Sequence, residues 1–138
     1  MRVSCDTLIL EVTRRCNMCC DHCLRGDAMS MDMDDALVDK IVDAVDGIGT
    51  VVFSGGEPTL NLAAIRHFFD KAERKYGYTP AFYIVTNGLA NQLELATILL
   101  DAYSRREDGA ERETYGVAIS RDMFHDYIPE TATSTTTR

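Results

Sequence analysis

The sequence predicts an α/β fold in which parallel strands alternate with amphipathic helices. Four short apolar runs, typical of buried strands, are separated by segments whose apolar residues recur at every third or fourth position. Such strands pair in parallel, because right-handed crossover helices cover the sheet. A chain of 138 residues with 46% apolar residues is long enough for one domain of this kind.

Each element follows from its local pattern. The expected strands are residues 7–12, 50–53, 81–86 and 115–119. The apolar faces of the expected helices are Leu37, Ile41 and Val45; then Leu62, Ile65, Phe69 and Ala72; then Leu93, Ala96, Leu99 and Tyr103. Ser30 is placed to cap the first helix, and Gly47 and Gly77 stand where the first two helices are expected to end.

Charge and hydropathy argue against two classes of partner. A net charge of -8 and a pI near 4.7 disfavour binding to nucleic acid, which depends on neutralising phosphates with Lys and Arg. No run approaches the roughly 18 consecutive apolar residues of a membrane span, and the start MRVSCDTL lacks the layout of a secretory signal. We therefore expect a cytoplasmic protein whose partners include neither nucleic acid nor a membrane.

Two polar segments stand outside the repeat of strands and helices. Residues 104–114 predict an exposed connection, in which Arg105 and Arg106 form part of a solvated surface. Residues 130–138 form a low-complexity Thr- and Ser-rich tail that is expected to be disordered. Residues 1–129 are thus expected to form the single domain.

Four of the five cysteines lie within eight residues, directly after the first expected strand. Such crowding cannot join distant parts of a chain by disulfides, and it is more typical of metal binding or redox chemistry. Cys16, Cys20 and Cys23 have the spacing C-x3-C-x2-C, and thiolates are the usual ligands of iron-sulfur clusters. Three protein ligands leave one iron open to a small molecule. Cys5 precedes the first expected strand and is assigned a structural role.

The spacing also allows other ligand sets. Cys16, Cys19 and Cys23 give C-x2-C-x3-C, and the pairs Cys16 with Cys19 and Cys20 with Cys23 could bind zinc. The two cysteine pairs of a zinc site are usually separated by about twelve or more residues, whereas these pairs abut. A ferredoxin run fails, because its third cysteine would fall on His22. An accidental group of reduced cysteines is the remaining alternative.

The stretch EVTRRCNMCCDHC resembles the signature of the radical S-adenosylmethionine (SAM) superfamily. The resemblance implies a partial (β/α) barrel of the TIM type, with about four βα units in this chain. It implies a 4Fe-4S cluster on Cys16, Cys20 and Cys23, with SAM on the unique iron and His22 against the adenine. Cys19 would be a bystander thiol or a fallback ligand. An electron from the cluster would break a carbon-sulfur bond of SAM to give methionine and a 5'-deoxyadenosyl radical.

The segments after the later strands extend the resemblance. The sequence GGEP at residues 55–58 alone would be an ordinary turn, but after the second strand it matches a family motif whose backbone and acid meet the SAM amino group. TNG at residues 86–88 resembles a family segment, although Asn-Gly is also a common turn. Ser120 matches a position near the SAM ribose or carboxylate. The expected SAM-binding residues are His22, Gly55, Gly56, Glu57, Pro58, Thr86, Asn87 and Ser120.

The remaining polar and sulfur-containing residues have weaker links to the site. Residues after the fourth strand could line the substrate end of the pocket or begin a solvated helix: Asp122, His125 and Asp126. His67, on the second helix, is expected at the surface or in packing. Loop and first-turn positions are expected for Met29, Met31 and Met33.

The resemblance therefore implies a radical SAM enzyme that uses an electron donor such as flavodoxin or ferredoxin. Its substrate would be a peptide, a protein glycyl site or a small metabolite, and short members of the family include activases of glycyl radical enzymes. A truncated, non-catalytic iron-sulfur or zinc domain is the alternative. The family core usually has six units, so a second copy or a partner chain is expected to complete the barrel at the exposed last strand.

Overall fold

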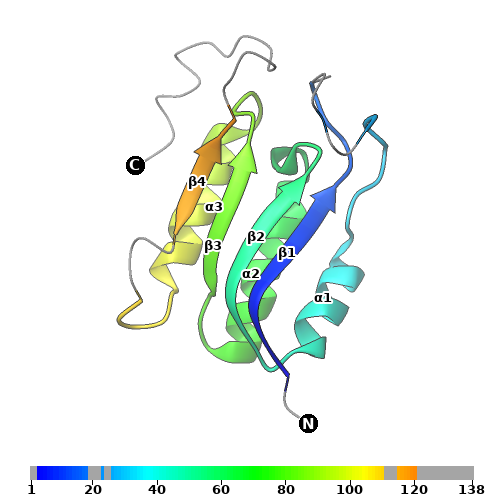
Figure 1. The fold of residues 1–138 in the computed structure, drawn as a ribbon. Helices are drawn as coiled ribbons and strands as arrows, with labels where there is room; N and C mark the ends of the chain where they lie inside the picture. Colours follow the sequence, from blue (N-terminus) through cyan, green and yellow to red (C-terminus); the bar gives the residue numbers. More distant parts are fainter. Residues whose placement is uncertain (1–2, 19–22, 24–25, 111–114, 121–138) are drawn as a thin grey trace.

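The computed structural model describes residues 3–18, 23, 26–110 and 115–120. Its strands form a parallel sheet in the order β1-β2-β3-β4 (Figure 1). The strands are β1 (Ser4–Thr13), β2 (Gly47–Gly55), β3 (Ala81–Thr86) and β4 (Gly116–Ile119). The helices are α1 (Asp35–Ala44), α2 (Leu62–Tyr76), α3 (Gln92–Ser104) and the short 3-10 helix η1 (Pro58–Asn61). The predicted alternation and parallel pairing are confirmed.

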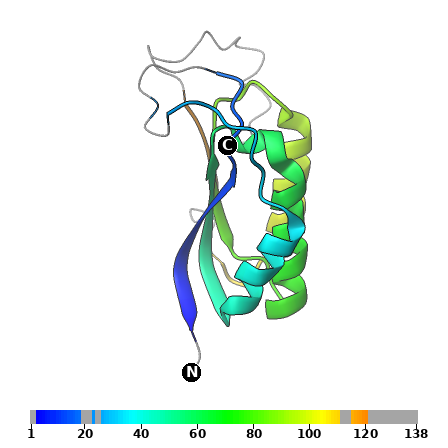
Figure 2. The same cartoon turned by 90° about the vertical axis from the view of Figure 1, so that its right-hand side faces the viewer.

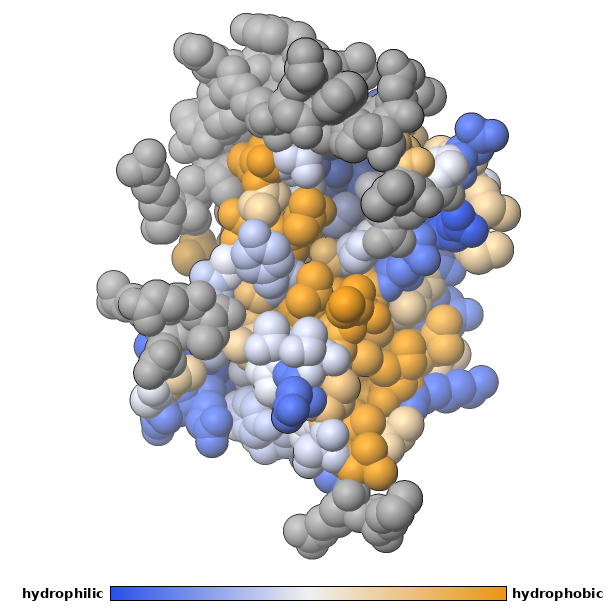
Figure 3. Space-filling model, in the orientation of Figure 1, coloured by the Kyte–Doolittle hydropathy of each residue, from blue (hydrophilic) through white to orange (hydrophobic). Residues whose placement is uncertain are grey.

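The sheet has one covered face and one open face. Helices α1, α2 and α3 all lie on the same side of it (Figure 2). Leu10, Phe53 and Ile84 pair in register toward these helices and are buried. Ile9 and Tyr83 point the other way and are 66% and 42% exposed, because successive side chains of a strand alternate between faces. Figure 3 shows apolar side chains gathered on this open face.

Aromatic rings fix the helical layer on the sheet. Phe53 of β2 meets Phe68 and Phe69 of α2 edge to face, with ring centroids 5.5 and 5.4 Å apart. Phe69 also packs against Phe82 of β3 at 5.5 Å. Each such pair adds about 0.5–1.5 kcal/mol beyond the area it buries. Helix α2 is therefore locked over the two central strands.

Helix α1 begins later than the sequence predicts. Asp34, rather than Ser30, is its N-cap, and Asp34 Oδ1 accepts a hydrogen bond from Leu37 N at 2.8 Å. Leu37, expected on the buried face, is 45% exposed, whereas Val38 and Val42 are buried. The other expected residues, Ile41 and Val45, are partly buried against the core beside Val38 and Val42.

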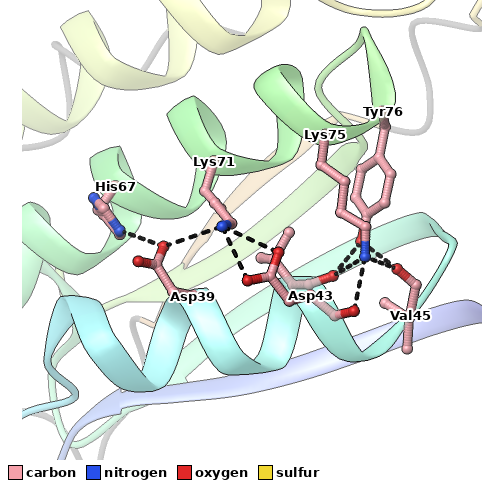
Figure 4. Close-up of polar contacts among 8 residues, drawn as sticks. Asp39, Asp43, Val45, His67, Lys71, Lys75 and Tyr76 are labelled. Atoms are coloured by element: carbon pink, nitrogen blue, oxygen red, sulfur yellow. Dashed lines mark hydrogen bonds and ion pairs between the residues drawn. The ribbon is translucent and has the colours of Figure 1, made fainter.

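The end of α1 also differs from the prediction, because side chains of α2 donate hydrogen bonds to its last carbonyl groups. Helix α1 ends before Gly47, which is instead the first residue of β2. Lys75 Nζ donates to Val45 O at 2.5 Å, and Tyr76 Oη donates to Val42 O at 2.9 Å (Figure 4). These donors satisfy carbonyls at the helix end, so a terminating glycine is not required.

Helices α2 and α3 show one confirmed feature and one correction. Gly77 ends α2 in the left-handed conformation, with φ of 83°, as predicted. In α3, Leu99 is buried as expected, but Leu93 is 74% exposed. Leu93 lies in the first turn of α3 and faces solvent, whereas Leu95 in the same turn is buried in the core. Within the described residues, no helix is long and apolar enough to cross a membrane.

Arg105 and Arg106 are packed rather than solvated, which corrects the prediction. The Arg105 side chain is 20% exposed, and its guanidinium lies 2.6 Å from Glu73 and 3.0 Å from Asp70. The guanidinium of Arg106 lies 4.0 Å from the ring centroid of Tyr103. The sequence showed only that acidic residues follow this basic pair, whereas the acids that bind Arg105 come from α2 and α3.

Candidate functional site

The carboxyl ends of the parallel strands meet at one end of the sheet (Figure 1), where ligands bind in folds of this class. Backbone hydrogen bonds join the segments that follow neighbouring strands. Gly56 N donates to Thr13 O at 2.9 Å, and Ser120 N donates to Thr86 O at 2.9 Å. The predicted motifs that the structure describes therefore lie at one edge of the molecule.

The cysteine loop, residues 16–28, has a stem made by the chain itself. Arg14 N donates to Met31 O at 2.8 Å, and Met29 N donates to Arg14 O at 2.9 Å. Thr13 and Asp32 form an antiparallel bridge at the same place. The segment after the loop thus returns along the end of β1, so both ends of the loop are held together.

Side chains reinforce this stem. Arg15 binds the Asp32 carboxylate through two contacts, Nε to Oδ1 at 2.9 Å and Nη2 to Oδ2 at 2.8 Å. Thr13 Oγ1 donates to Asp32 Oδ1 at 2.5 Å. Hydrogen bonds from Arg15 and then Thr13 lower the pKa of Asp32. The carboxylate of Asp32 therefore links the outgoing strand to the returning segment.

The loop after β2 also forms hydrogen bonds with this stem. Asn61 Nδ2 donates to Val12 O at 2.7 Å and to Met33 O at 3.1 Å. Arg15 Nη2 also donates to Leu60 O. Asn61 thus bridges the end of β1 and the returning segment, which joins the second loop to the first.

The two glycines of the GGEP segment allow a close approach between backbones. A Cβ atom on Gly56 would lie 2.2 Å from Arg15 O, and one on Gly55 would lie 2.5 Å from Thr13 O. Glu57 N donates to Arg15 O at 2.8 Å. The glycines therefore serve, at the least, to let the second loop run directly against the start of the cysteine loop.

The Glu57 side chain points into the protein, where four donors occupy it. Glu57 is 1% exposed. Its Oε1 accepts from Thr59 N at 3.1 Å, Thr59 Oγ1 at 2.7 Å and Thr86 Oγ1 at 2.6 Å, and its Oε2 accepts from Asn87 N at 2.8 Å. Because a buried carboxylate must be satisfied by nearby donors, these four hydrogen bonds account for the burial of Glu57. Glu57 also joins the second loop to the third.

Asn87 extends this connection to the cysteine loop. It is 6% exposed, and its Oδ1 accepts from Leu89 N at 3.0 Å. Its Nδ2 donates to Asn17 Oδ1 at 2.7 Å, across 70 positions of the chain. Asn17 follows Cys16 directly. The three loops are therefore one hydrogen-bonded unit.

Several residues of this unit were not assigned to the site from the sequence. They are Thr13, Arg15, Asn17, Asp32, Thr59 and Asn61. Their shared signal is a polar side chain within the motif segments or just after them, but their partners lie far away in the chain. Neither spacing nor periodicity reveals such pairings.

The described part of the cysteine loop carries free thiols. Cys16 is half-buried and Cys23 is exposed, and neither forms a disulfide. Cys19, Cys20 and His22 lie outside the described residues. Among the residues that are described, no group of three or more His, Cys, Asp or Glu could hold a metal ion. Free thiols on a loop with a closed stem fit an iron-sulfur cluster, which thiolates bind.

Cys5 was predicted to precede the first strand, but it lies within the sheet. It lies within β1 (Ser4–Thr13), is partly buried against the core, and its Sγ donates to Thr7 O at 3.2 Å. The strand extends three residues further toward the amino end than its apolar run, which explains the difference. Cys5 thus lies at the opposite end of the sheet from the cysteine loop.

His67 lies between helices, as predicted for a packing residue. Its side chain is 24% exposed, and Nε2 contacts Asp39 Oδ1 at 2.8 Å (Figure 4). The hydrogen bond from His67 lowers the pKa of Asp39. Several candidates lie outside the described residues, where they stay predictions: Asp122, His125, Asp126 and the tail at 130–138.

The fold and the loop define the class of protein. A parallel α/β sheet that carries clustered thiols after its first strand, and whose next two loops bind that segment, is a partial (β/α) barrel with a cysteine-loop site. The family model of the radical SAM superfamily matches residues 10–107. The chain belongs to this superfamily.

Two curated proteins share sequence with the chain. GTP 3',8-cyclase of Chlorobaculum tepidum is 29% identical over 126 residues, which cover 86% of this chain and 38% of that protein. An uncharacterised protein of Methanocaldococcus jannaschii is 35% identical over 72 residues, which cover 50% of this chain and 25% of that protein. The matched regions therefore span well under half the length of these relatives.

Solved structures share the fold. The structure described as "Native anSMEcpe with bound AdoMet and Kp18Cys peptide" has a TM-score of 0.57 and 22% identity, over 72% of this chain and 30% of that one. A structure of histidine-tagged anSMEcpe with bound AdoMet has a TM-score of 0.52 and 21% identity, with the same coverage. At this identity the likeness concerns the fold, and it confirms the predicted partial barrel.

Proposed function

We propose that this chain binds SAM and an iron-sulfur cluster as a radical SAM enzyme that cleaves SAM reductively. The observation that carries the proposal is the hydrogen-bonded unit of three strand-end loops around the start of the cysteine loop, in a chain that belongs to this superfamily. Cys16, Cys20 and Cys23 would hold the cluster as thiolates. When bound, a 4Fe-4S cluster supplies the electron that splits a carbon-sulfur bond of SAM.

The remaining residues of the site would bind and orient SAM. The half-buried backbone of Gly55 and Gly56 would meet the amino group together with Glu57, whose carboxylate is held in place by protein donors. His22 would lie against the adenine, and Ser120 would contact the ribose or carboxylate. Pro58, Thr86 and Asn87 would shape the loops that hold the cosubstrate.

The open face of the sheet is the proposed place for the substrate. It carries exposed apolar side chains, Ile9, Tyr83 and Val85 among them, and Figure 3 shows such side chains gathered on this face. The substrate would be a peptide, a protein glycyl site or a small metabolite, and the first two include the role of a glycyl-radical-enzyme activase. Flavodoxin or ferredoxin would donate the electron. The cytoplasm, where thiols stay reduced, is the proposed compartment.

A second candidate function is a non-catalytic domain that binds a cluster, or zinc, without turnover. The observation that favours it is length: the matched region is 30% of each solved relative, and the sheet has four strands in the described residues. Strands that close the pocket in a six-unit barrel would have to come from elsewhere. The two candidates differ in whether SAM is cleaved.

The test is anaerobic reconstitution with iron and sulfide, followed by reduction with dithionite and assay of 5'-deoxyadenosine from SAM. We expect about four iron atoms per chain and formation of the product. The triple alanine variant at Cys16, Cys20 and Cys23 should bind no cluster, whereas Cys5→Ala, outside the loop, should load normally. A loaded cluster without product would favour the non-catalytic candidate, and zinc in place of iron would exclude both iron-sulfur forms.

A further inference from the structure

We infer that Asn17 and Asn87 form a positioning pair that fixes the first cluster ligand, Cys16, from the third strand-end loop. This inference rests on the proposed function, because Cys16 matters here as a ligand. Neither asparagine is expected to touch the cluster or the substrate. They act through the backbone on either side of Cys16.

Cys16 is held on both flanks. On one side, Arg15 O accepts from Glu57 N at 2.8 Å. On the other side, Asn17 Oδ1 accepts from Asn87 Nδ2 at 2.7 Å. The two donor residues are themselves joined, because Asn87 N donates to Glu57 Oε2 at 2.8 Å. The chain from Arg15 to Asn17 thus closes a ring of hydrogen bonds with Glu57 and Asn87.

The rigid partner in the pair is Asn87. Asn87 is 6% exposed, and its Oδ1 accepts from Leu89 N at 3.0 Å. This bond fixes the orientation of the amide, since a reversed amide would set its NH2 group against the Leu89 N–H. The NH2 group must therefore face Asn17. Asn17 is exposed and takes its orientation from this donor.

Buried residues lie within this ring and directly beside it. Glu57 is 1% exposed and accepts three further hydrogen bonds, from Thr59 and Thr86. Met18, the residue after Asn17, is also buried, at 7% exposed. A residue of the third loop therefore restricts where the Cys16 thiol can lie before any cluster is present.

The experiment measures cluster retention rather than turnover. Reconstituted wild type and Asn17→Ala are mixed anaerobically with excess chelator, and the loss of the iron-sulfur absorbance is followed with time. We expect Asn17→Ala to lose its cluster about three- to tenfold faster, the range that corresponds to one hydrogen bond. Its EPR signal after reduction should broaden, because the Cys16 thiolate would sample more than one orientation. The thermal unfolding temperature of the apo protein should fall only modestly, because water can reach Asn87 Nδ2 where the exposed Asn17 side chain is removed.

The matched control is Asn17→Asp, whose carboxylate still accepts from Asn87 Nδ2 and should retain the cluster within about twofold of wild type. Asn87→Asp should also keep a bond, because the exposed Asn17 amide can turn to donate. The double variant Asn17→Asp with Asn87→Asp sets two acceptors face to face. It should lose its cluster faster than the product of the two single effects predicts.

The outcomes separate this inference from the proposed function. Equal loss rates and equal EPR signals for wild type and Asn17→Ala would overturn the positioning pair and leave the proposed function intact. A double variant that behaves as the product of its singles would overturn the pair as well. Failure of the wild type itself to load iron would overturn the proposed function, and the inference with it.

Discussion

Asn87 N donates to Glu57 Oε2 at 2.8 Å, and this contact joins two loops that lie 30 residues apart in the chain. The same carboxylate accepts three more hydrogen bonds through Oε1. An acid that sequence similarity associates with a ligand is therefore built into the protein, where it holds the loops after β2 and β3 together.

Glu57→Gln should destabilise the fold. The amide NH2 would face a backbone N–H, of either Thr59 or Asn87, so one buried donor would lose its acceptor. We expect a loss of about 1–3 kcal/mol in the free energy of unfolding, measured by urea denaturation of the apo protein. The control is Glu94→Gln, whose exposed side chain pairs with Arg66 at 3.8 Å, and which should change the free energy by less than about 0.5 kcal/mol. Equal effects of the two changes would contradict the assigned role.

Gly56→Ala should be far more damaging than Gly47→Ala. A Cβ atom on Gly56 would meet Arg15 O at 2.2 Å, so the backbone of the cysteine loop would have to move. At Gly47 the nearest atom is Tyr78 Oη at 3.7 Å, an ordinary contact. We expect Gly56→Ala to cost roughly 2 kcal/mol or more and Gly47→Ala little, by thermal unfolding. A normal melting temperature for Gly56→Ala would show that the close approach is not required.

Truncation of neighbouring residues of β1 should lower the stability by very different amounts, because these residues lie on different faces of the sheet. Leu10 is 3% exposed, and Leu10→Ala should cost about 2–5 kcal/mol through the cavity that it leaves. Ile9 is 66% exposed, and Ile9→Ala should cost less than about 1 kcal/mol. Chemical denaturation of both variants measures the difference. Similar losses would mean that the open face is covered in the isolated chain.

Tyr76 should make stability fall at high pH. Burial raises the pKa of Tyr76 to about 12, from an ordinary value of 10.0. The unfolded chain therefore loses the phenol proton first, so this contribution is complete below pH 10 and is lost as the pH rises through about 12. The folded phenol donates to Val42 O and Val45 O, at 2.9 and 3.1 Å.

Tyr76→Phe should thus be less stable than wild type near neutral pH, and the gap should narrow as the pH rises above 10. Urea denaturation at several pH values measures the gap. Tyr83→Phe, on the open face, is the control for loss of a phenol group. A gap for Tyr76→Phe that is constant with pH would contradict this explanation.

The exposed sheet should promote self-association. The open face of the sheet carries exposed apolar side chains, Ile9, Tyr83 and Val85 among them, which a second copy of the chain could bury. We expect light scattering to give a molar mass above the 15.4 kDa of one chain. Val85→Lys, on the open face, should shift the protein toward monomer, whereas Leu100→Lys, on exposed α3, should not. A fully active monomer at all concentrations would exclude this role for the open face.

The fold could be predicted from the sequence because its strongest signals are local. Buried parallel strands such as residues 81–86 read as continuous apolar runs, and the structure places β3 at the same residues. Helix ends were less predictable, since tertiary contacts decide them. The donors that close α1 come from Lys75 and Tyr76, about thirty positions away.

The site was predictable only where a motif marks it. The cysteine spacing and the GGEP segment identify the first two loops, but the direction of a side chain depends on what surrounds it. Glu57 turns inward because donors from η1 and β3 meet there. Asn17 and Asp32 were missed for the same reason, since their partners are distant or lie beyond the loop.

The stem of the cysteine loop has an evolutionary consequence. Arg14 pairs with both Met29 and Met31, so the strands are separated from changes in the segment between Cys23 and Met29. Substitutions and insertions there can accumulate without disturbing the strands or the spacing of the three cysteines. One scaffold can therefore accommodate differently shaped segments there, provided that Thr13, Arg15 and Asp32 keep the base of the loop shut.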